Sequence, residues 1–373
     1  MERTPAGEGG QAAARFARWA DAARALTWRV ARNTQGAVLR GPTMDRSQRA
    51  ARRGGMGRLG CLLAAACVAA LAWSAGAVAG GTQVSVVAVA GRVWVTTGFD
   101  VVKLDALTGR IMRRNKTRYR FPIEIGASDG NVWVSSVENG FVSGALTRIP
   151  FERGRVTQAL VFPSRPIFAL AVGSGTTWAL VGPWGSLKLA AVDQATGRST
   201  IRPLRTQIGW IAADNVGGTP GLFGVTSKGR AVRLDRNGRV VWRAKTDTIQ
   251  GPPAVGLGGV WVASRTGLYR INAVSGRVKV KIPIRGAAAE LAIGGGYVWM
   301  ISLRTTKAGE SYELFKIDPR ATHVVRHVEL PGPVGPISFG NGALWMGRAT
   351  PTVSVIRIAS STLRAQLFAK NLG

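Results

Sequence analysis

The sequence predicts an all-β protein: a seven-bladed β-propeller of four-stranded blades, preceded by a basic N-terminal tail and one apolar transmembrane or signal helix. Three observations support this fold class. A glycine and tryptophan pair returns at intervals of 38 to 46 residues. Between the pairs lie short apolar runs bounded by glycine or proline, which is typical of strands and turns. The composition, with 49 glycines and 12 tryptophans among 46% hydrophobic residues, is globular and favours strands.

The repeat is marked by a tryptophan that follows a glycine by three residues. The pair occurs six times, and a seventh copy at Gly221-Leu-Phe-Gly-Val225 has Phe223 in place of the tryptophan. The six pairs are Gly91 and Trp94, Gly130 and Trp133, Gly175 and Trp178, Gly258 and Trp261, Gly296 and Trp299, and Gly342 and Trp345. Such self-similarity predicts a repeat architecture. We therefore expect each tryptophan to pack between neighbouring blades rather than to bind a ligand.

Each copy has a second landmark, a short strand that ends in a tight turn, as in Val102-Lys-Leu-Asp-Ala-Leu-Thr-Gly109. An aspartate at the first turn position accepts backbone N–H groups further along, and the glycine supplies a positive φ. The aspartates that we expect to be structural for this reason are Asp105, Asp193, Asp235 and Asp318.

Four strands in each period of about 40 residues predict a propeller blade, and closure into a ring protects the sheet edges. A superhelical solenoid is the competing architecture for a repeat. It would need a polar cap at each end, whereas the last copy reaches the C-terminus through Leu363–Phe368, which reads as an ordinary outer strand. The sequence thus favours a closed propeller over residues 80–373.

The front of the chain predicts contact with a membrane. Residues 1–58 form a basic tail, with amphipathic spacing at 11–32, and residues 59–79 are uncharged and long enough to span a bilayer. The basic flank places the tail in the cytoplasm and the propeller outside. The same segment also reads as a signal peptide cleaved after Ala79, above all if translation starts at Met44 rather than Met1. Both interpretations stay open: a membrane-anchored extracytoplasmic propeller, or a secreted one.

The net charge of +31 does not by itself indicate nucleic-acid binding. The basic residues are spread along the whole chain, only 10 of them are lysines, and they form no recognised binding motif. We expect a solvated basic surface, or attraction to anionic lipid or wall polymer, and no specific nucleic-acid partner. Cys61 and Cys67 both lie in the apolar segment, so the propeller has neither a disulfide framework nor a thiolate metal site.

A recurrent pattern carries a family resemblance: an apolar strand, Gly-x-Gly, x-Val-Trp-Val, a polar loop, and Arg-Ile-Asp-x-x-Thr-Gly. It resembles the bacterial extracytoplasmic propellers with YVTN-type, NHL-type and PQQ-like repeats, including virginiamycin B lyase, and it covers residues 82–373. Because such propellers include enzymes, assembly factors and plain binding modules, the resemblance implies a fold and a location rather than one activity.

The chain departs from the enzymes of this group. A virginiamycin B lyase-like site implies histidine and carboxylate pairs around the channel with a divalent metal, but the only histidines are His323 and His327. Four residues apart, they are predicted to share one face of the outermost strand of blade six, at the rim. PQQ is disfavoured because the docking element Asp235–Trp242, with a late tryptophan that packs on the next blade, occurs once. No Walker loop, Ser/His/Asp set or zinc spacing is present.

One pair of acidic residues holds equivalent positions in two repeats. Nine residues before the repeat tryptophan stand Glu124 in blade two and Glu290 in blade six, where other copies have Ser85, Ala169, Pro252 and Pro336. If this position begins the innermost strand, both carboxylates face the channel mouth and could hold a divalent cation or a cationic ligand. The alternative is that each carboxylate pairs with a nearby arginine.

The loops after the tryptophan strands are the predicted partner-binding face, because propellers bind through such loops. The candidate residues are Glu138, Trp184, Lys228, Arg265, Arg304 and Arg348. Trp184 is outside the repeat register and is either exposed or packed under its own loop. The sequence therefore predicts a non-enzymatic module that binds an extracytoplasmic protein, a wall polymer or a small ligand. The alternative is a propeller enzyme of the lyase or hydrolase type that uses the channel carboxylates and a divalent metal.

Overall fold

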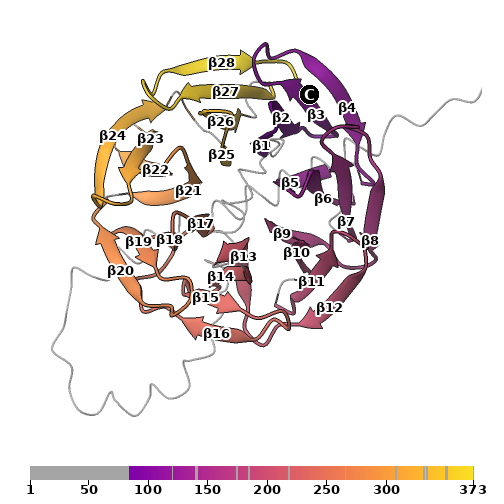
Figure 1. The fold of residues 1–373 in the computed structure, drawn as a ribbon, viewed down its shortest axis with the longest axis horizontal. Coiled ribbons are helices and arrows are strands. Elements are labelled where there is room, and N and C mark those ends of the chain that lie inside the picture. The colour runs from indigo at the N-terminus through magenta and orange to yellow at the C-terminus, as the bar shows by residue number, and fades with distance from the viewer. Residues whose placement is uncertain are drawn as a thin grey trace, which may run out of the picture. The chain divides into compact units, whose positions relative to one another are not determined.

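The computed structural model describes residues 84–372 apart from residues 120, 139–141, 174, 184, 217–218, 265, 285, 307–308, 331, 333–334 and 349–351. The chain divides into two units, Met1–Gly81 and Thr82–Gly373. The second unit contains seven four-stranded antiparallel sheets in the described part of the chain, and the strands of every sheet are consecutive in sequence. Arranged around a common centre, they form the predicted seven-bladed propeller (Figure 1).

Blade 1 is β1–β4, blade 2 is β5–β8, and so on to blade 7, which is β25–β28. The innermost strands are β1 (Val86–Val89), β5 (Phe121–Ser128), β9 (Ile167–Gly173), β13 (Ile208–Val216), β17 (Ala254–Gly256), β21 (Ala287–Gly294) and β25 (Ile337–Gly340). The second strands are β2 (Arg92–Thr96), β6 (Asn131–Val137), β10 (Thr176–Val181), β14 (Thr219–Thr226), β18 (Gly259–Ser264), β22 (Tyr297–Thr306) and β26 (Ala343–Arg348). The third strands are β3 (Asp100–Asp105), β7 (Gly144–Pro150), β11 (Lys188–Asp193), β15 (Ala231–Leu234), β19 (Gly267–Ile271), β23 (Gly309–Asp318) and β27 (Ser354–Ala359). The outermost strands are β4 (Ile111–Lys116), β8 (Gln158–Phe162), β12 (Ser199–Pro203), β16 (Val240–Arg243), β20 (Val278–Ile282), β24 (His323–Leu330) and β28 (Ala365–Ala369).

The repeat aromatic residues lie in the second strands and are buried, as predicted. Trp94, Trp133, Trp261, Trp299 and Trp345 and the substitute Phe223 have no exposed surface, and Trp178 is 5% exposed. Each belongs to an apolar cluster that contains residues of the following blade. Trp345 of blade 7, for example, packs with Val86 and Val95 of blade 1. Burial of a large aromatic side chain at every junction supplies the main apolar contact between neighbouring sheets.

Basic residues of the third strands lie across these tryptophans. Lys103, Arg148, Arg270, Lys316 and Arg357 each pair with the repeat tryptophan of their own blade, with the charged group 5.1 to 5.9 Å from the ring centroid. Three of them also donate to a backbone carbonyl of the next blade: Lys103 to Phe151 (2.7 Å), Arg270 to Pro319 (3.4 Å) and Lys316 to Ser360 (3.0 Å). The cation thus contributes a cation–π contact and an inter-blade hydrogen bond at once.

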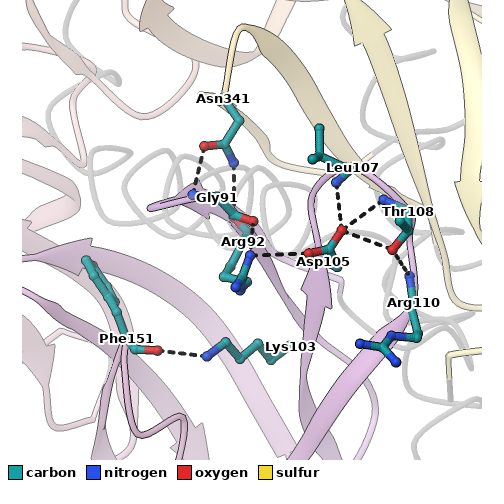
Figure 2. A network of polar contacts seen from close by, with 9 residues as sticks. All are labelled: Gly91, Arg92, Lys103, Asp105, Leu107, Thr108, Arg110, Phe151 and Asn341. Atoms are coloured by element: carbon teal, nitrogen blue, oxygen red, sulfur yellow. Dashed lines mark hydrogen bonds and ion pairs between the residues drawn. The ribbon is translucent and has the colours of Figure 1, made fainter.

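The ring closes without exchange of a strand, because blade 7 consists wholly of C-terminal strands. Side-chain bonds tie blade 7 to blade 1 instead. Asn341 accepts the Gly91 N–H (3.1 Å) and donates to the Arg92 carbonyl (3.3 Å), as Figure 2 shows, and Ser338 Oγ accepts the Ala88 N–H (3.3 Å). On the outer side, Arg114 contacts the Leu372 carbonyl. The closed ring confirms the rejection of a solenoid.

The turn aspartates are structural, as predicted. Asp105 Oδ1 accepts the backbone N–H groups of Leu107 (3.1 Å) and Thr108 (3.0 Å), which holds the turn visible in Figure 2. Asp193, Asp235 and Asp318 accept backbone N–H groups of their own turns in the same way. Hydrogen bonds to the charged form hold the pKa of Asp105, Asp193 and Asp318 below the ordinary value.

The late tryptophan of blade 4 also lies where the sequence predicts. Trp242 donates its indole N–H to the Ala273 carbonyl of blade 5 (3.1 Å). Its ring covers Gly276, which has a φ of +70°, so closely that a Cβ added there would lie 2.7 Å from the indole. A glycine is therefore required at this turn by both φ and space.

The front of the chain lies outside the described residues. The predicted basic tail (1–58), its amphipathic segment (11–32) and the apolar segment (59–79) all belong to this part. Within residues 84–372, with the gaps given above, there is no helix with the length and apolar character needed to cross a bilayer.

Candidate functional site

The two predicted glutamates occupy equivalent positions on the innermost strands. Glu290 pairs with Ile301, two residues after Trp299, and the Glu124 N–H is bonded to Ser135, two residues after Trp133. Blade 4 places Trp210 at this position, because Trp210 pairs with Val225, two residues after Phe223. Counting back nine residues misses Trp210, since the first hairpin of blade 4 is longer than the others. The ring of Trp210 packs on the core of blades 4 and 5.

Both glutamates are half-buried and lie close to a backbone irregularity. The pairing of β5 with β6 shifts register between Pro122 and Ile125, and that of β21 with β22 shifts between Ala288 and Glu290. A β-bulge re-aims the side chain it carries. Glu124 uses this freedom to reach blade 3, where its Oε2 accepts the Leu170 N–H of β9.

The two carboxyl groups have raised pKa values. Burial raises the pKa of Glu124 to about 7, against a partial lowering by the hydrogen bond from Leu170. Burial raises the pKa of Glu290 to about 8, and the negative charge of Glu124 adds to this effect. The two blades lie on opposite sides of the channel (Figure 1), so the repulsion acts across it. At neutral pH the pair therefore holds protons that isolated carboxyl groups release.

No arginine neutralises the pair among the residues that the structure describes. Neither Glu124 nor Glu290 forms an ion pair there, although four other acidic residues do. The described residues therefore do not show the predicted alternative, in which each glutamate pairs with a nearby arginine. The described part of the chain also contains no group of three or more His, Cys, Asp or Glu side chains placed to hold a metal ion. The chemistry available is that of two carboxylates with the backbone of the inner strands.

The predicted loop residues lie in separate blades and do not form one cluster. Glu138 follows β6 and Lys228 follows β14, and both are exposed. Arg304 on β22 forms an ion pair with Glu313 (2.9 Å), and Arg348 ends β26 half-buried. Because all second strands run in the same direction, these four residues lie on one face of the ring. Trp184 and Arg265 lie outside the described residues.

The histidines lie on the outermost strand of blade 6, as predicted, but they do not share a face. His323 pairs with Asp318 and His327 with Phe315, three residues apart on β23, because the register shifts between Lys316 and Ile317. The extra residue of this bulge turns one of the two side chains to the opposite face. Both histidines are exposed, and His327 stacks on Phe315 with the ring centroids 5.6 Å apart. The expected shared face is wrong, and the two rings cannot hold one metal ion.

A polar cluster that the sequence did not indicate joins blades 4 and 5. Asp247 Oδ2 accepts the hydroxyl groups of Thr266 and Tyr269 (both 2.5 Å) and the ammonium group of Lys281 (3.0 Å). These donors hold the pKa of Asp247 far below its ordinary value. Its members come from a linker, a turn and two strands, so spacing along the chain carries no signal of it. The cluster is internally satisfied and tethers the linker to blade 5.

Two cavities lie at junctions between blades. One, of about 460 Å³, is at the junction of blades 5 and 6 and is lined by Leu257, Arg270, Gly296, Tyr297 and Arg320, among others. The second, of about 380 Å³, lies between blades 6 and 7 at the rim and includes His327 and Arg364. Neither was expected, because both form between blades rather than within one repeat.

Comparisons with known proteins find the fold but no family. No protein-family model and no curated protein matches the chain. Among solved structures, a β-propeller domain of Cps50 (Swd1) from Myceliophteria thermophila matches with a TM-score of 0.56 at 13% identity, over 74% of this chain and 95% of that one. The computationally designed Ika8 protein matches with a TM-score of 0.54 at 13% identity, over 74% and 96%. The dihydro-heme d1 dehydrogenase NirN, in complex with DHE, matches with a TM-score of 0.51 at 11% identity, over 78% of this chain and 66% of that one.

These neighbours have different functions, and all are far below the identity at which function is shared. The finer YVTN, NHL or PQQ-like assignment therefore gains no support from a named relative. What the comparisons establish is that the chain from Thr82 onward has the β-propeller fold.

Proposed function

We propose that this propeller is a non-enzymatic binding module whose channel takes up a cation or a cationic ligand between Glu124 and Glu290. One observation supports this most directly: the innermost strands place two carboxyl groups at equivalent positions, the charge of Glu124 raises the pKa of Glu290, and no ion pair neutralises either group among the described residues. A bound cation would relieve both the repulsion and the cost of burial.

The donor set favours a loosely held cation. A tightly bound Ca²⁺ takes six to eight oxygen ligands, and this pair supplies at most four carboxylate oxygens, one of which already accepts the Leu170 N–H. Water and backbone carbonyls would complete the shell. Because the site must lose its protons first, its affinity for a cation rises as the pH passes through about 7 to 8.

Ligand-dependent thermal stabilisation tests this proposal. With CaCl₂ or tetramethylammonium chloride at pH 8.5, and NaCl at matched ionic strength as reference, we expect the melting temperature of the native chain to rise with at least one of the two cations. The double variant Glu124→Gln/Glu290→Gln should lose that rise, whereas Glu329→Gln, which removes an exposed carboxylate of the same blade as Glu290, should keep it. A rise of equal size in the double variant would remove the channel site.

We further propose an extracytoplasmic location, on the sequence of residues 59–79, with loops such as those of Glu138 and Lys228 as the partner-binding face. The partner would be an extracytoplasmic protein, a wall polymer or a small ligand. No observation favours the alternative of a lyase or hydrolase. N-terminal sequencing of the exported chain distinguishes the two forms: a start at Gly80 means a cleaved signal, and retention of residues 59–79 in the membrane fraction means an anchor. Recovery of the chain in the cytoplasm alone would contradict both.

A further inference from the structure

Two blade junctions share a side-chain hydrogen bond that the other described junctions lack. Asp129 in blade 2 accepts the Gly175 N–H of blade 3 (2.7 Å), and Asn341 in blade 7 accepts the Gly91 N–H of blade 1 (3.1 Å; Figure 2). Both acceptors stand four residues before the repeat tryptophan, with φ near +50°, and both donors stand three residues before it. An oxygen at the first position thus binds the glycine N–H of the next blade. We call this contact the inter-blade clamp.

At the junction of blades 5 and 6 the clamp position is Leu257, with a φ of +49°. Its side chain is 37% exposed and has no atom that accepts a hydrogen bond. The donor of this junction is the Gly296 N–H, the counterpart of those of Gly91 and Gly175. Among the described residues, the Gly296 N–H has no protein acceptor. The backbone is thus arranged as in the clamp, and the oxygen is missing. Ala90 of blade 1, with a φ of +50°, also lacks the oxygen, but only the Leu257 junction, of these two, lines one of the two cavities described above.

A cavity of about 460 Å³ opens at this junction, and the charged side chains that line it have a net positive charge. The Arg270 guanidinium, stacked on Trp261, donates to the carbonyls of Leu257 (3.1 Å) and Pro319 (3.4 Å), and within the described chain it has no carboxylate partner. Arg320, exposed at the edge, adds a second positive charge.

Asp318 is the acidic residue among those lining the cavity. Its Oδ1 is occupied by the backbone N–H groups of Arg320 (2.7 Å) and Ala321 (3.2 Å). With two arginines and one aspartate, the lining keeps a net positive charge.

We propose that this cavity is a binding site for the carboxylate of an external ligand, with a carboxylate oxygen on the Gly296 N–H where Asp129 and Asn341 place their own oxygens in the other clamps. The arginines suit the charge of such a group. Leu257 and the Tyr297 ring, which also line the cavity, suit an apolar or aromatic body attached to it. The site lies at the turn end of the innermost strands, whereas Glu124 and Glu290 lie at the middle of theirs and line no part of the cavity, so this inference is independent of the proposed cation site.

Calorimetric titration with two kinds of probe tests the proposal. It also distinguishes two sources of the carboxylate, a small organic acid and the C-terminus of a partner chain. The probes are benzoate, for a small acid, and an acetylated tetrapeptide ending in phenylalanine with a free C-terminus, for a partner chain; benzamide and the C-terminally amidated peptide are the neutral controls. We expect one charged probe to bind and its neutral counterpart to bind at least tenfold more weakly.

Two variants locate the binding. Leu257→Asp supplies the missing oxygen from the protein's own side chain, as Asp129 does in its clamp. It should lower the affinity for the charged probe at least tenfold and raise the melting temperature. Arg320→Gln changes an exposed side chain and should weaken binding of the charged probe several-fold without a change in melting temperature. This variant keeps the proposal testable if Leu257→Asp does not fold. Failure of the native chain to bind either charged probe, or binding that Arg320→Gln leaves unchanged, would overturn the site.

Discussion

At the scale of single residues, position outweighs residue type. Fifteen acidic residues follow Thr82, and most of those with a described role are turn caps or ion-pair partners on the surface. Glu124 and Glu290 differ because the fold places both beside the channel, where burial raises the pKa of each carboxyl group and the negative charge of Glu124 raises that of Glu290 further. The same residue type is therefore structural in one place and a candidate ligand in the other.

The first prediction concerns the pH dependence of stability. In the unfolded chain both carboxyl groups titrate near 4.5, and in the folded chain at about 7 and about 8. The folded state therefore binds more protons between these values, so the free energy of unfolding falls as the pH rises from about 4.5 to 8 and levels off above. Glu124→Gln/Glu290→Gln removes this loss, and at pH 9 the double variant should be more stable than the native chain by several kcal/mol, because each unit of raised pKa corresponds to about 1.4 kcal/mol.

Urea unfolding at pH 5, 7 and 9 measures this difference. Glu329→Gln, on the exposed outer strand of blade 6, is the control and should follow the native profile. Parallel pH profiles for the native chain and the double variant would show that the two carboxyl groups titrate normally.

The second prediction concerns Leu257. A leucine in the left-handed region is strained, while asparagine tolerates it and brings the oxygen that Gly296 lacks. Leu257→Asn should therefore raise the free energy of unfolding by about 1 kcal/mol, part from relief of strain and part from one new hydrogen bond. Chemical denaturation checks it, with Leu257→Ala as the control that offers no oxygen. Equal effects of the two substitutions would contradict the clamp.

At the scale of elements, the strands follow from the repeat pattern, and their irregularities do not. Alternating apolar runs and the Gly-x-x-Trp spacing correctly predict four strands in each blade. The bulge in β24 that separates His323 from His327, and the bulges beside Glu124 and Glu290, arise from the pairing of two strands. A single strand read alone keeps a period of two, so a shared face for His323 and His327 was the natural expectation.

The third prediction compares how much two tryptophans contribute to stability, given the strands on which they lie. Trp133 on a second strand is fully buried between blades 2 and 3, whereas Trp242 on an outermost strand is half-buried. Trp133→Ala should cost about 4 kcal/mol of unfolding free energy, in line with large cavities in cores. Trp242→Ala should cost about 2 kcal/mol, from one lost hydrogen bond and partial loss of packing. Urea unfolding of the two variants gives the order, and a larger cost for Trp242→Ala would contradict the assigned roles.

At the scale of the whole molecule, the closure of the ring depends on contacts between the first and last blades. No strand crosses from one end of the chain to the other. Apolar packing of Trp345 on blade 1, the Asn341 clamp and the Arg114 contact with Leu372 hold the ends together. The junction of blades 7 and 1 is therefore the one at which the ring can open without breaking chain continuity.

The fourth prediction compares two clamps. Asn341→Gly and Asp129→Gly each remove one clamp without strain at positive φ, and each should cost about 1 kcal/mol of unfolding free energy. At the closing junction the loss also promotes local opening, so Asn341→Gly should be cleaved faster than Asp129→Gly by a protease under native conditions. Equal cleavage rates would show that the closing junction is no weaker than an internal one.

The sequence by itself determined the number of blades, the role of the tryptophans, the turn aspartates and the two positions of the glutamate pair. These features recur with the repeat, so their physical cause is local and visible in spacing. The tertiary structure decided what lies between repeats: the absence of an arginine beside Glu124 and Glu290 in the described residues, Trp210 at the same level, the Asp247 cluster and the cavity at Leu257. Each depends on which side chains two different blades bring together, and only the closed ring sets those distances.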